Sequence, residues 1–401
     1  MATHQHFLSI VTSLAYFVTL SMQYNMKKLI IPILALSFSI TSCYKTAPDV
    51  MEAESQDSGG SAAGEAGVLT AAEWSDLKNW SFWNNLLNSN SNLKNTSSEW
   101  SFYTNNRISV VVQDNDRNPV VNATVSLKKD EALVFETISD NRGSAELWVG
   151  LTDENLNVNP DDYTLYVNGV EAFRGFNQGT NYLIAADNAD YDNEAQVAFI
   201  VDATGSMSDE LNFLKLDLED VINKVGIKNP TTTIHTGSVF YRDKGDDYLT
   251  KMSSFTTNIA STITFIEDQR AGGGGDTPEA VHTALEEALS KLAWNEHAKT
   301  RLAFLMLDAP PHHKSEVIES LKKSINEAAK RGIKLIPIAA SGVDKETEFL
   351  MRHFAIATNG TYVFITNDSG IGNDHIQATV GDYEVEYLND LLVRLIHENM
   401  N

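Results

Sequence analysis

Cysteine and basic residues are both scarce in this chain of 401 residues. Cys43 is the single cysteine, so no disulfide can form within the chain. Lys and Arg number 30 against 54 Asp and Glu, which gives a formal net charge of −24 at pH 7. Such an acidic surface repels phosphate backbones and attracts cations. We therefore expect no nucleic-acid partner, and the composition suits an exported protein.

The signatures of common enzyme classes are also missing. The glycine-rich stretch "GGGGDTP" (272–278) lacks the lysine of a phosphate-binding loop, and no G-x-G-x-x-G dinucleotide fingerprint is present. No Ser–His–Asp set can be ordered from the sequence. The histidines in "APPHH" (309–313) are adjacent, so they converge poorly on one metal ion, and we expect a solvated turn there. The sequence favours a binding protein over an enzyme.

Long apolar runs occur at the N-terminus alone. "FLSIVTSLAYFVTLSM" (7–22) has 16 residues, whereas a membrane span needs about 20. "MKKLIIPILALSFSITSC" (26–43) places two lysines before an apolar run, the layout of a secretory signal. We expect translation to start at Met26, which makes residues 1–25 a doubtful upstream segment. The alternative is a membrane hairpin of the two apolar runs.

The end of this segment, "ITSC", resembles the bacterial lipobox, in which the cysteine is lipidated and becomes the mature N-terminus. The resemblance implies lipidation at Cys43 and a protein anchored to the membrane by its N-terminal lipid. It also implies a place in the bacterial cell envelope: at the outer membrane, in the periplasm or exposed on the surface. Residues 1–43 would thus be removed or modified before the protein acts.

Two short segments follow the predicted anchor. Residues 44–69 are small, polar and acidic, which predicts a flexible linker. Residues 70–100 contain Trp74, Trp80 and Trp83, and Thr70 and Glu73 have the spacing of a helix capping box. Clustered tryptophans can bind sugar or a membrane interface. We favour a segment that packs its rings onto the following domain.

Residues 101–190 alternate as short β-strands do, with turn signals at 115–119 and 140–143. The predicted strands are 108–114, 123–127, 135–139, 144–149 and 162–168. Five short strands at this spacing predict a small antiparallel β-sandwich. The stretch resembles carboxypeptidase-regulatory-like, transthyretin-like modules, and the resemblance implies a spacer or docking domain without catalytic residues.

Strands and helices alternate in the last part of the chain, residues 191–401. Its predicted strands are 196–202, 232–243, 248–255, 300–308, 333–341 and 360–366. Its predicted helices are 207–226, 278–294, 315–332, 345–359 and 383–399. Three of the strands are apolar enough to be buried on both faces. This alternation of strands and helices predicts an α/β domain with a doubly wound, mostly parallel sheet.

Three polar clusters fall where ligands bind such sheets, past the carboxyl ends of strands. The first cluster, "DATGSM", contains Asp202, Thr204 and Ser206. The second is the glycine loop, which contains Asp276 and Thr277. The third is Asp308, which follows "LAFLML". Carboxylates and hydroxyls without thiolates suit a hard cation, Mg²⁺, Mn²⁺ or Ca²⁺. Each cluster alone has an ordinary structural explanation as a helix cap or turn.

In this order on one fold, the clusters resemble the metal-ion-dependent adhesion site of the von Willebrand factor type A (VWA) family. "DATGSM" is similar to its Asp-x-Ser-x-Ser element, with threonine in place of the usual first serine. The resemblance implies metal ligands at Asp202, Thr204, Ser206 and Asp308, and at either Asp276 or Thr277. It further implies that the metal keeps an open position for a carboxylate from a protein or other acidic ligand.

We therefore predict a lipid-anchored, non-enzymatic protein that binds an acidic ligand through a divalent cation in its VWA domain. Two alternatives stay open. One is a metal-assisted hydrolase that uses the same site. The other is a structural envelope lipoprotein whose metal site is degenerate.

Overall fold

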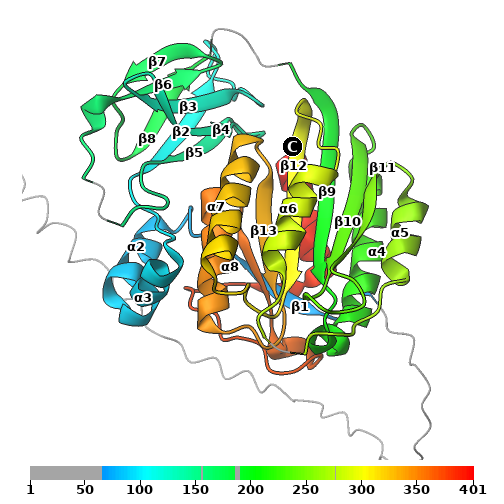
Figure 1. Ribbon diagram of the computed structural model, residues 1–401. Coiled ribbons are helices and arrows are strands. Elements are labelled where there is room, and N and C mark those ends of the chain that lie inside the picture. Colours follow the sequence, from blue (N-terminus) through cyan, green and yellow to red (C-terminus); the bar gives the residue numbers. More distant parts are fainter. Residues whose placement is uncertain (1–65, 155–156, 186–189, 276) are drawn as a thin grey trace, which may run out of the picture. The chain divides into compact units, whose positions relative to one another are not determined.

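Strands from both ends of the described chain meet in one large sheet (Figure 1). This computed structural model describes residues 66–154, 157–185, 190–275 and 277–401, all within one unit that spans residues 62–401. Cys43, Met26 and Asp276 therefore lie outside the described residues. The expected signal segment and linker lie outside them as well, apart from residues 66–69.

The large sheet has eight strands, and its central five are parallel. In spatial order the strands are β11 (Thr250–Thr256), β10 (Thr233–Tyr241), β9 (Asp192–Asp202), β12 (Ala298–Leu307), β13 (Lys334–Ala339), β14 (Tyr362–Ile365), β1 (Thr70–Trp74) and β15 (Val385–Tyr387). β11 and β1 run antiparallel to their neighbours. The prediction of an α/β fold with a mostly parallel sheet is confirmed.

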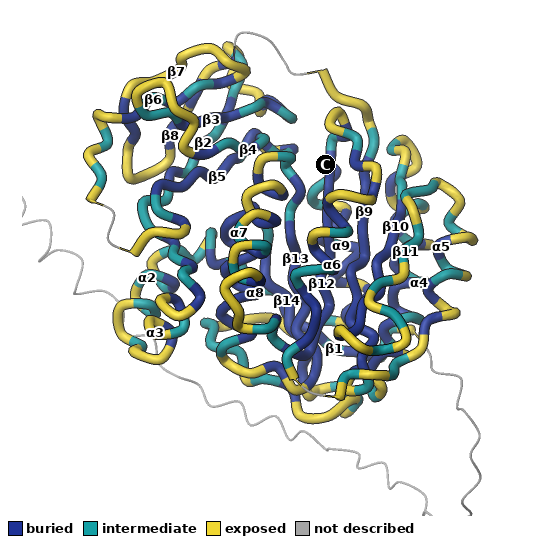
Figure 2. The backbone as a smooth tube through the Cα atoms, viewed as in Figure 1, coloured by how far each residue is buried: buried dark blue, intermediate teal, exposed yellow. Residues whose placement is uncertain are grey.

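Helices cover both faces of the sheet. The first face packs against α6 (Val281–Lys291), α7 (Ser315–Lys330) and α8 (Lys345–Ala357), and the second against α4 (Leu211–Lys228), α5 (Ile259–Glu267) and α9 (Leu388–Met400). The alternation along β9 explains this: Ala198 and Ile200 belong to the first core, and Val197 and Phe199 to the second. Figure 2 shows the central strands buried along most of their length.

β1 corrects one prediction. The spacing of Thr70 and Glu73 predicted a helix start, but these residues form a strand between β14 and β15. Ala71 and Ala72 are fully buried there, so pairing with distant strands outweighs the local capping pattern. The chain thus enters the large sheet before it forms the segment at 101–190, a feature that the expected domain boundary at residue 191 omits.

The tryptophan segment continues as two short helices, α2 (Trp80–Ser89) and α3 (Ser91–Trp100). Trp83 is fully buried and its ring stacks on Phe349 of α8 at 5.9 Å between centroids. Arg352 of α8 lies over the same Trp83 ring and forms two hydrogen bonds with Asp76, at 2.8 and 2.6 Å. Trp83 therefore packs on α8 in the last part of the chain and not, as predicted, on the following region. The partly buried Trp80 does contact that region, with its ring 5.7 Å from the ring of Trp148.

Residues 107–184 form two small sheets. One contains β5 (Ser144–Trp148), β2 (Arg107–Gln113) and β8 (Thr180–Ile184); the other contains β4 (Ala132–Ile138), β3 (Thr124–Lys129), β6 (Tyr163–Val167) and β7 (Val170–Arg174). Within the described residues, a 3-10 helix, η1 (Pro160–Asp162), also lies in this region. Two more, η2 (Gly205–Asp209) and η3 (Asn367–Ser369), lie in the last part of the chain. The sequence did not predict β7 and β8. The identification of this region as a transthyretin-like sandwich stays a prediction.

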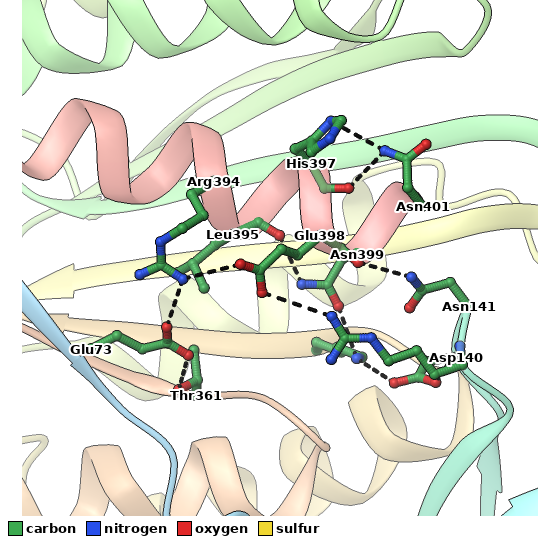
Figure 3. Close-up of polar contacts among 12 residues, drawn as sticks. Glu73, Asp140, Asn141, Thr361, Arg394, Leu395, His397, Glu398, Asn399 and Asn401 are labelled. Carbon is green, nitrogen blue, oxygen red and sulfur yellow. Dashed lines mark hydrogen bonds and ion pairs between the residues drawn. The ribbon is translucent and has the colours of Figure 1, made fainter.

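The turn between β4 and β5 contacts the large sheet and α9 (Figure 3). Lys334 donates hydrogen bonds to Asp140 at 2.7 Å and to Asn399 at 2.9 Å. The Asn141 side-chain amide donates to the Glu398 carbonyl at 2.8 Å. Since Lys334 is the first residue of β13, this junction lies at the amino ends of the parallel strands. The carboxyl ends, where ligands are expected, remain clear of it.

Candidate metal site

The fold brings two of the predicted clusters to one edge of the sheet. β9 ends at Asp202, and β12 runs parallel beside it, with Met306 paired to Val201. Asp308 therefore follows two residues after Met306, one position past the end of β12. Asp202 is fully buried and Asp308 is 7% exposed. Two carboxyl groups thus come to adjacent strand ends in a place with little access to water.

Hydrogen bonds within the first loop hold its three side chains together. Oδ1 of Asp202 accepts hydrogen bonds from the backbone N–H of Thr204 at 2.8 Å and from the Thr204 hydroxyl at 2.7 Å. The hydroxyls of Thr204 and Ser206 lie 3.1 Å apart. Thr204 is fully buried, whereas Ser206 is exposed. The loop therefore exposes the Ser206 side chain to solvent, while the side chains of Asp202 and Thr204 are buried.

One further oxygen of Asp202 and one of Asp308 lack a close hydrogen bond within the described residues, although the hydroxyls of Tyr241 and Ser206 lie near enough to lower the pKa of Asp202 and Asp308, respectively. Among the described residues, neither Oδ2 of Asp202 nor Oδ1 of Asp308 forms a hydrogen bond, although both are buried. Burial, followed by the Asp308 carboxylate, raises the pKa of Asp202 to about 7. Burial also raises the pKa of Asp308 to about 6, with Glu210 and Asp209 adding to the effect. Buried carboxylates that lack partners fit a bound cation.

Backbone hydrogen bonds fasten the glycine loop to the other two loops. Gly205 N–H donates to the Gly273 carbonyl at 3.1 Å, and Gly272 N–H to the Ala203 carbonyl at 3.0 Å. Glu279 N–H donates to the Pro310 carbonyl at 2.9 Å, beyond Asp308. Gly274 has a φ of +66°, and a Cβ there would lie 2.9 Å from Thr204 Cβ. The close approach of the loops therefore requires a glycine.

The predicted third ligand is not placed with the others. Asp276 lies outside the described residues. Thr277 follows it in the glycine loop, where its side chain is exposed. Among the described residues, Thr277 makes no side-chain hydrogen bond to Asp202, Thr204, Ser206 or Asp308. Its role as a ligand, and that of Asp276, stays a prediction.

Glu279 is a site residue that the sequence analysis missed. It is 3% exposed, and its Oε2 has no hydrogen-bond partner among the described residues. Its Oε1 lies 2.9 Å from the position of a Cβ on Gly274, the same distance as Thr204 Cβ. Burial raises the pKa of Glu279 to about 9, and Asp202 is the next cause. Its place three residues after Asp276 was the available signal.

The segment between β10 and β11, which the sequence pattern "YRDKGDDY" (241–248) marks as a polar hairpin, contacts the Asp202 loop. Arg242 is 7% exposed and donates from Nε to the Ala203 carbonyl at 3.0 Å. Asp243 contacts Nε2 of His312 at 3.0 Å, whereas His313 contacts the Glu99 carbonyl at 3.1 Å. The two adjacent histidines therefore contact different elements. Arg242 fixes the backbone between Asp202 and Thr204.

A cation at this edge would depend on hydroxyl and water ligands. In the described ranges, no group of three or more His, Cys, Asp or Glu side chains is arranged to hold a metal ion. Asp202 and Asp308 contribute two carboxylates, so Thr204 and Ser206 would have to supply the next oxygens. This donor set is the one that Mg²⁺ prefers, since it completes its shell with water.

Residues 196–370 match the family model described as the von Willebrand factor A domain. The match covers less than half of the 401-residue chain, and it supports the predicted resemblance of this part to the VWA family.

Two curated proteins and one solved structure are similar to this chain, to different degrees. An ariadne-like RING finger protein, R811, of Acanthamoeba polyphaga mimivirus is 38% identical over 137 residues, which cover 34% of this chain and 13% of that protein. The alpha-protein kinase vwkA of Dictyostelium discoideum is 26% identical over 167 residues, 41% of this chain and 26% of the kinase. This chain thus spans about a quarter or less of their length. A von Willebrand factor type A structure from Catenulispora acidiphila has 15% identity and a TM-score of 0.36, and covers 52% of this chain and 43% of that one.

Proposed function

We propose that this protein binds an acidic ligand through a divalent cation held by its VWA domain. The observation that carries the proposal is the pair of buried carboxylate oxygens, Asp202 Oδ2 and Asp308 Oδ1, which lack partners in the described structure. They stand beside two hydroxyls that are already aligned by hydrogen bonds. A cation would neutralise the carboxylates and use the hydroxyls without losing its remaining charge.

Asp202, Thr204, Ser206 and Asp308 would hold the ion, with Asp276 or Thr277 as a further ligand. The ion, Mg²⁺ or Mn²⁺ (or Ca²⁺), supplies positive charge at an exposed loop of a protein that is otherwise strongly acidic. Exposure of Ser206 puts this charge within reach of a carboxylate from another molecule. Acidic ligands would otherwise be repelled by the net charge of −24. Binding would therefore depend on the cation.

Thermal unfolding tests the metal site. Metal that binds the folded state alone should stabilise it by about 2.7 kcal/mol at about 100-fold excess over Kd. The Ser206→Ala variant should lose this gain and keep its fold, because Ser206 is exposed. Ser208→Ala is the matched control, since Ser208 is an exposed serine two residues away in η2. If wild type and Ser206→Ala melt identically with and without Mg²⁺, the site is degenerate and the structural-lipoprotein alternative takes its place.

The open coordination position has its own test. Mn²⁺ bound to the full chain should accelerate water-proton relaxation through its exchangeable water. Glutarate, as a carboxylate probe, should reduce that enhancement by displacing the water, and should do so less in Ser206→Ala. An enhancement that glutarate leaves unchanged would contradict the acidic-ligand proposal.

A non-enzymatic role is part of this proposal. The alternative of a metal-assisted hydrolase is favoured by one observation, the additional buried carboxyl group of Glu279 beside the site. Because its pKa is raised to about 9, this carboxyl is protonated near neutral pH and could serve as a general acid. Turnover of p-nitrophenyl phosphate or p-nitrophenyl acetate that needs Mg²⁺ and disappears in Ser206→Ala would establish the hydrolase instead.

We also propose that the protein is anchored in the bacterial cell envelope by a lipid on Cys43. The support is the "ITSC" motif after an apolar run preceded by two lysines. Among the described residues, no helix is long and apolar enough to cross a membrane. The region 101–190 would then act as a spacer or docking domain next to the VWA domain.

A further inference from the structure

Two adjoining hollows lie along α2, where the tryptophan segment meets the start of β2. The first has a volume of about 320 Å³ and the second about 270 Å³. They share Asn84, Thr104 and Asn105 as lining residues, so they adjoin and are treated together as one groove. We call it the α2 groove. Pockets of about 300–1,000 Å³ accommodate small organic ligands, and the metal site lies on other elements, at the ends of β9 and β12.

Amide side chains dominate the lining of the α2 groove. Five side-chain amides line it: Asn84, Asn88, Asn105, Asn106 and Gln178. Within the part of the chain that the structure describes, the amides of Asn84, Asn88 and Gln178 form no hydrogen bond. Each offers a donor and an acceptor in one plane. The groove therefore presents several unused amides to a ligand that both donates and accepts hydrogen bonds.

Two further asparagines of the groove are held in place. Asn105 donates from its amide to the carbonyls of Asp153 and Glu154 at 2.8 and 3.0 Å, which leaves its own oxygen available. Asn106 donates to the Val149 carbonyl at 3.0 Å. These bonds fix the wall of the groove, so that a ligand would meet a preformed acceptor. Preformed polar groups are what fixes a ligand's orientation in such sites.

Aromatic rings add apolar surface to the same groove. Tyr103 lines the first hollow, and Trp80 and Phe176 line the second. Trp80 is partly exposed and lies 5.7 Å from the ring of Trp148, which supports it. Rings beside amides suit a ligand with apolar C–H faces and polar edges. The sequence analysis raised sugar binding for this tryptophan cluster. Trp83 is buried, and the partly exposed Trp80 ring carries the Arg107 guanidinium on one side, at 4.7 Å from its centroid, which leaves its remaining exposed surface for a ligand.

Charge in the groove is balanced, in contrast with the acidic protein around it. Its charged lining residues are Lys94, Arg107 and Glu154. Arg107 is already paired with Glu146, through hydrogen bonds of 2.7 and 2.6 Å. Lys94 and Glu154 have opposite signs. A strongly charged ligand would therefore gain little here, and a neutral one is favoured.

We propose that the α2 groove binds a neutral oligosaccharide. Vicinal hydroxyls of a sugar would pair with the in-plane donor and acceptor of Asn84, Asn88 and Gln178. The C–H faces of the pyranose rings would lie against Tyr103 and the exposed part of the Trp80 ring, while the buried Phe176 supports the wall of the groove. Two adjoining hollows match a ligand of at least two sugar units. The proposal does not rest on the metal site, and saccharide binding at this groove is independent of divalent cations.

Saturation-transfer NMR and calorimetry on the full chain test the proposal. The probes are maltotetraose, cellotetraose and tetraacetylchitotetraose, with tetragalacturonate as the charged comparison. At least one neutral probe should bind saturably, with equal affinity in Mg²⁺ and in EDTA. The double change Asn84→Ala and Asn88→Ala should weaken binding about tenfold, since it removes two amides. Gln178→Ala, in the loop before β8, should weaken it in the same direction.

Asn85→Ala is the matched control, because Asn85 is an exposed asparagine of α2 that does not line the groove. It should bind the neutral probe as wild type does. The proposal is overturned if no neutral probe binds below about 10 mM, a Kd that corresponds to under 3 kcal/mol. It is also overturned if tetragalacturonate binds as well as the neutral probes, or if Asn85→Ala weakens binding as much as the double change.

Discussion

Asp202 uses its two oxygens differently. Oδ1 organises the loop through Thr204, while Oδ2 is buried without a partner in the described structure. An unpaired buried carboxylate costs stability unless it is protonated or binds a cation. The pKa of about 7 for Asp202 expresses this conflict. A residue that stabilises its own loop with one oxygen thus also carries a second, buried oxygen whose negative charge a metal ion would neutralise.

Stability without metal should fall as the pH rises. The pKa values of Asp202 and Asp308 are raised to about 7 and about 6, against about 3.9 in the unfolded chain. Between about pH 4 and pH 7 the folded state therefore binds more protons than the unfolded state, so the free energy of unfolding decreases with pH. Urea denaturation in EDTA should show this decrease, and Asp202→Asn should show a smaller one. Identical pH profiles would contradict the assignment.

Asp276 and Thr277 can be distinguished by their response to metal. They are adjacent in the glycine loop, and a third ligand from this loop is predicted from the resemblance to the adhesion site. In Asp276→Ala and Thr277→Ala, one variant should lose the Mg²⁺-dependent rise in melting temperature and the other should keep it. The variant that loses the rise identifies the ligand. If both keep it, the ion is held without this loop.

Elements differ in how far their own sequences determine them. β9 and β12 carry continuous apolar runs, so the sequence predicted both closely. β1 and β15 have five and three residues, and both depend on pairing with distant strands. Local pattern cannot report such pairing. This is why the capping-box spacing of Thr70 and Glu73 led to the wrong prediction of a helix start.

The residues of the candidate site also differ in how far the local sequence could identify them. Asp202, Thr204 and Ser206 belong to one short motif after a strong strand, so the sequence could nominate them together. Glu279 stands just before α6, where an acidic residue is ordinarily explained by the helix dipole. Only the fold brings it against the Asp202 loop, because the close packing at Gly274 is a tertiary feature.

The buried ion pair between Asp76 and Arg352 should be a main attachment of the tryptophan segment. Arg352 is 1% exposed and Asp76 is 4% exposed. Arg352→Met would leave the Asp76 carboxylate buried without its partner, which typically costs about 3–5 kcal/mol. Urea denaturation should show a loss of this size.

An exposed pair provides the control for that change. Lys129 and Asp162 lie 3.2 Å apart with both side chains more than 40% exposed. Lys129→Met should cost less than about 1 kcal/mol, because surface pairs contribute little. A loss in Arg352→Met no larger than that in Lys129→Met would show that the tryptophan segment is held mainly by its rings.

At the scale of the whole molecule, the two proposed binding surfaces lie on different elements. The metal site occupies the carboxyl ends of β9 and β12, and the α2 groove lies where α2 meets β2. The junction at Lys334 and Asp140 lies at the amino ends of the parallel strands. Ligands could therefore be bound at the two surfaces independently.

The last prediction concerns the anchor. Cys43 is the single cysteine, so Cys43→Ser removes the only thiol that can be lipidated. In a bacterial expression host, wild type should incorporate radiolabelled palmitate and sediment with membranes. Cys43→Ser should incorporate none and appear in the soluble fraction, because its signal would no longer lead to a lipid. Thermal melting of the two purified proteins should agree, because the proposed role of Cys43 is lipidation alone. Equal labelling and equal membrane sedimentation of the variant would show that another segment holds the protein at the membrane.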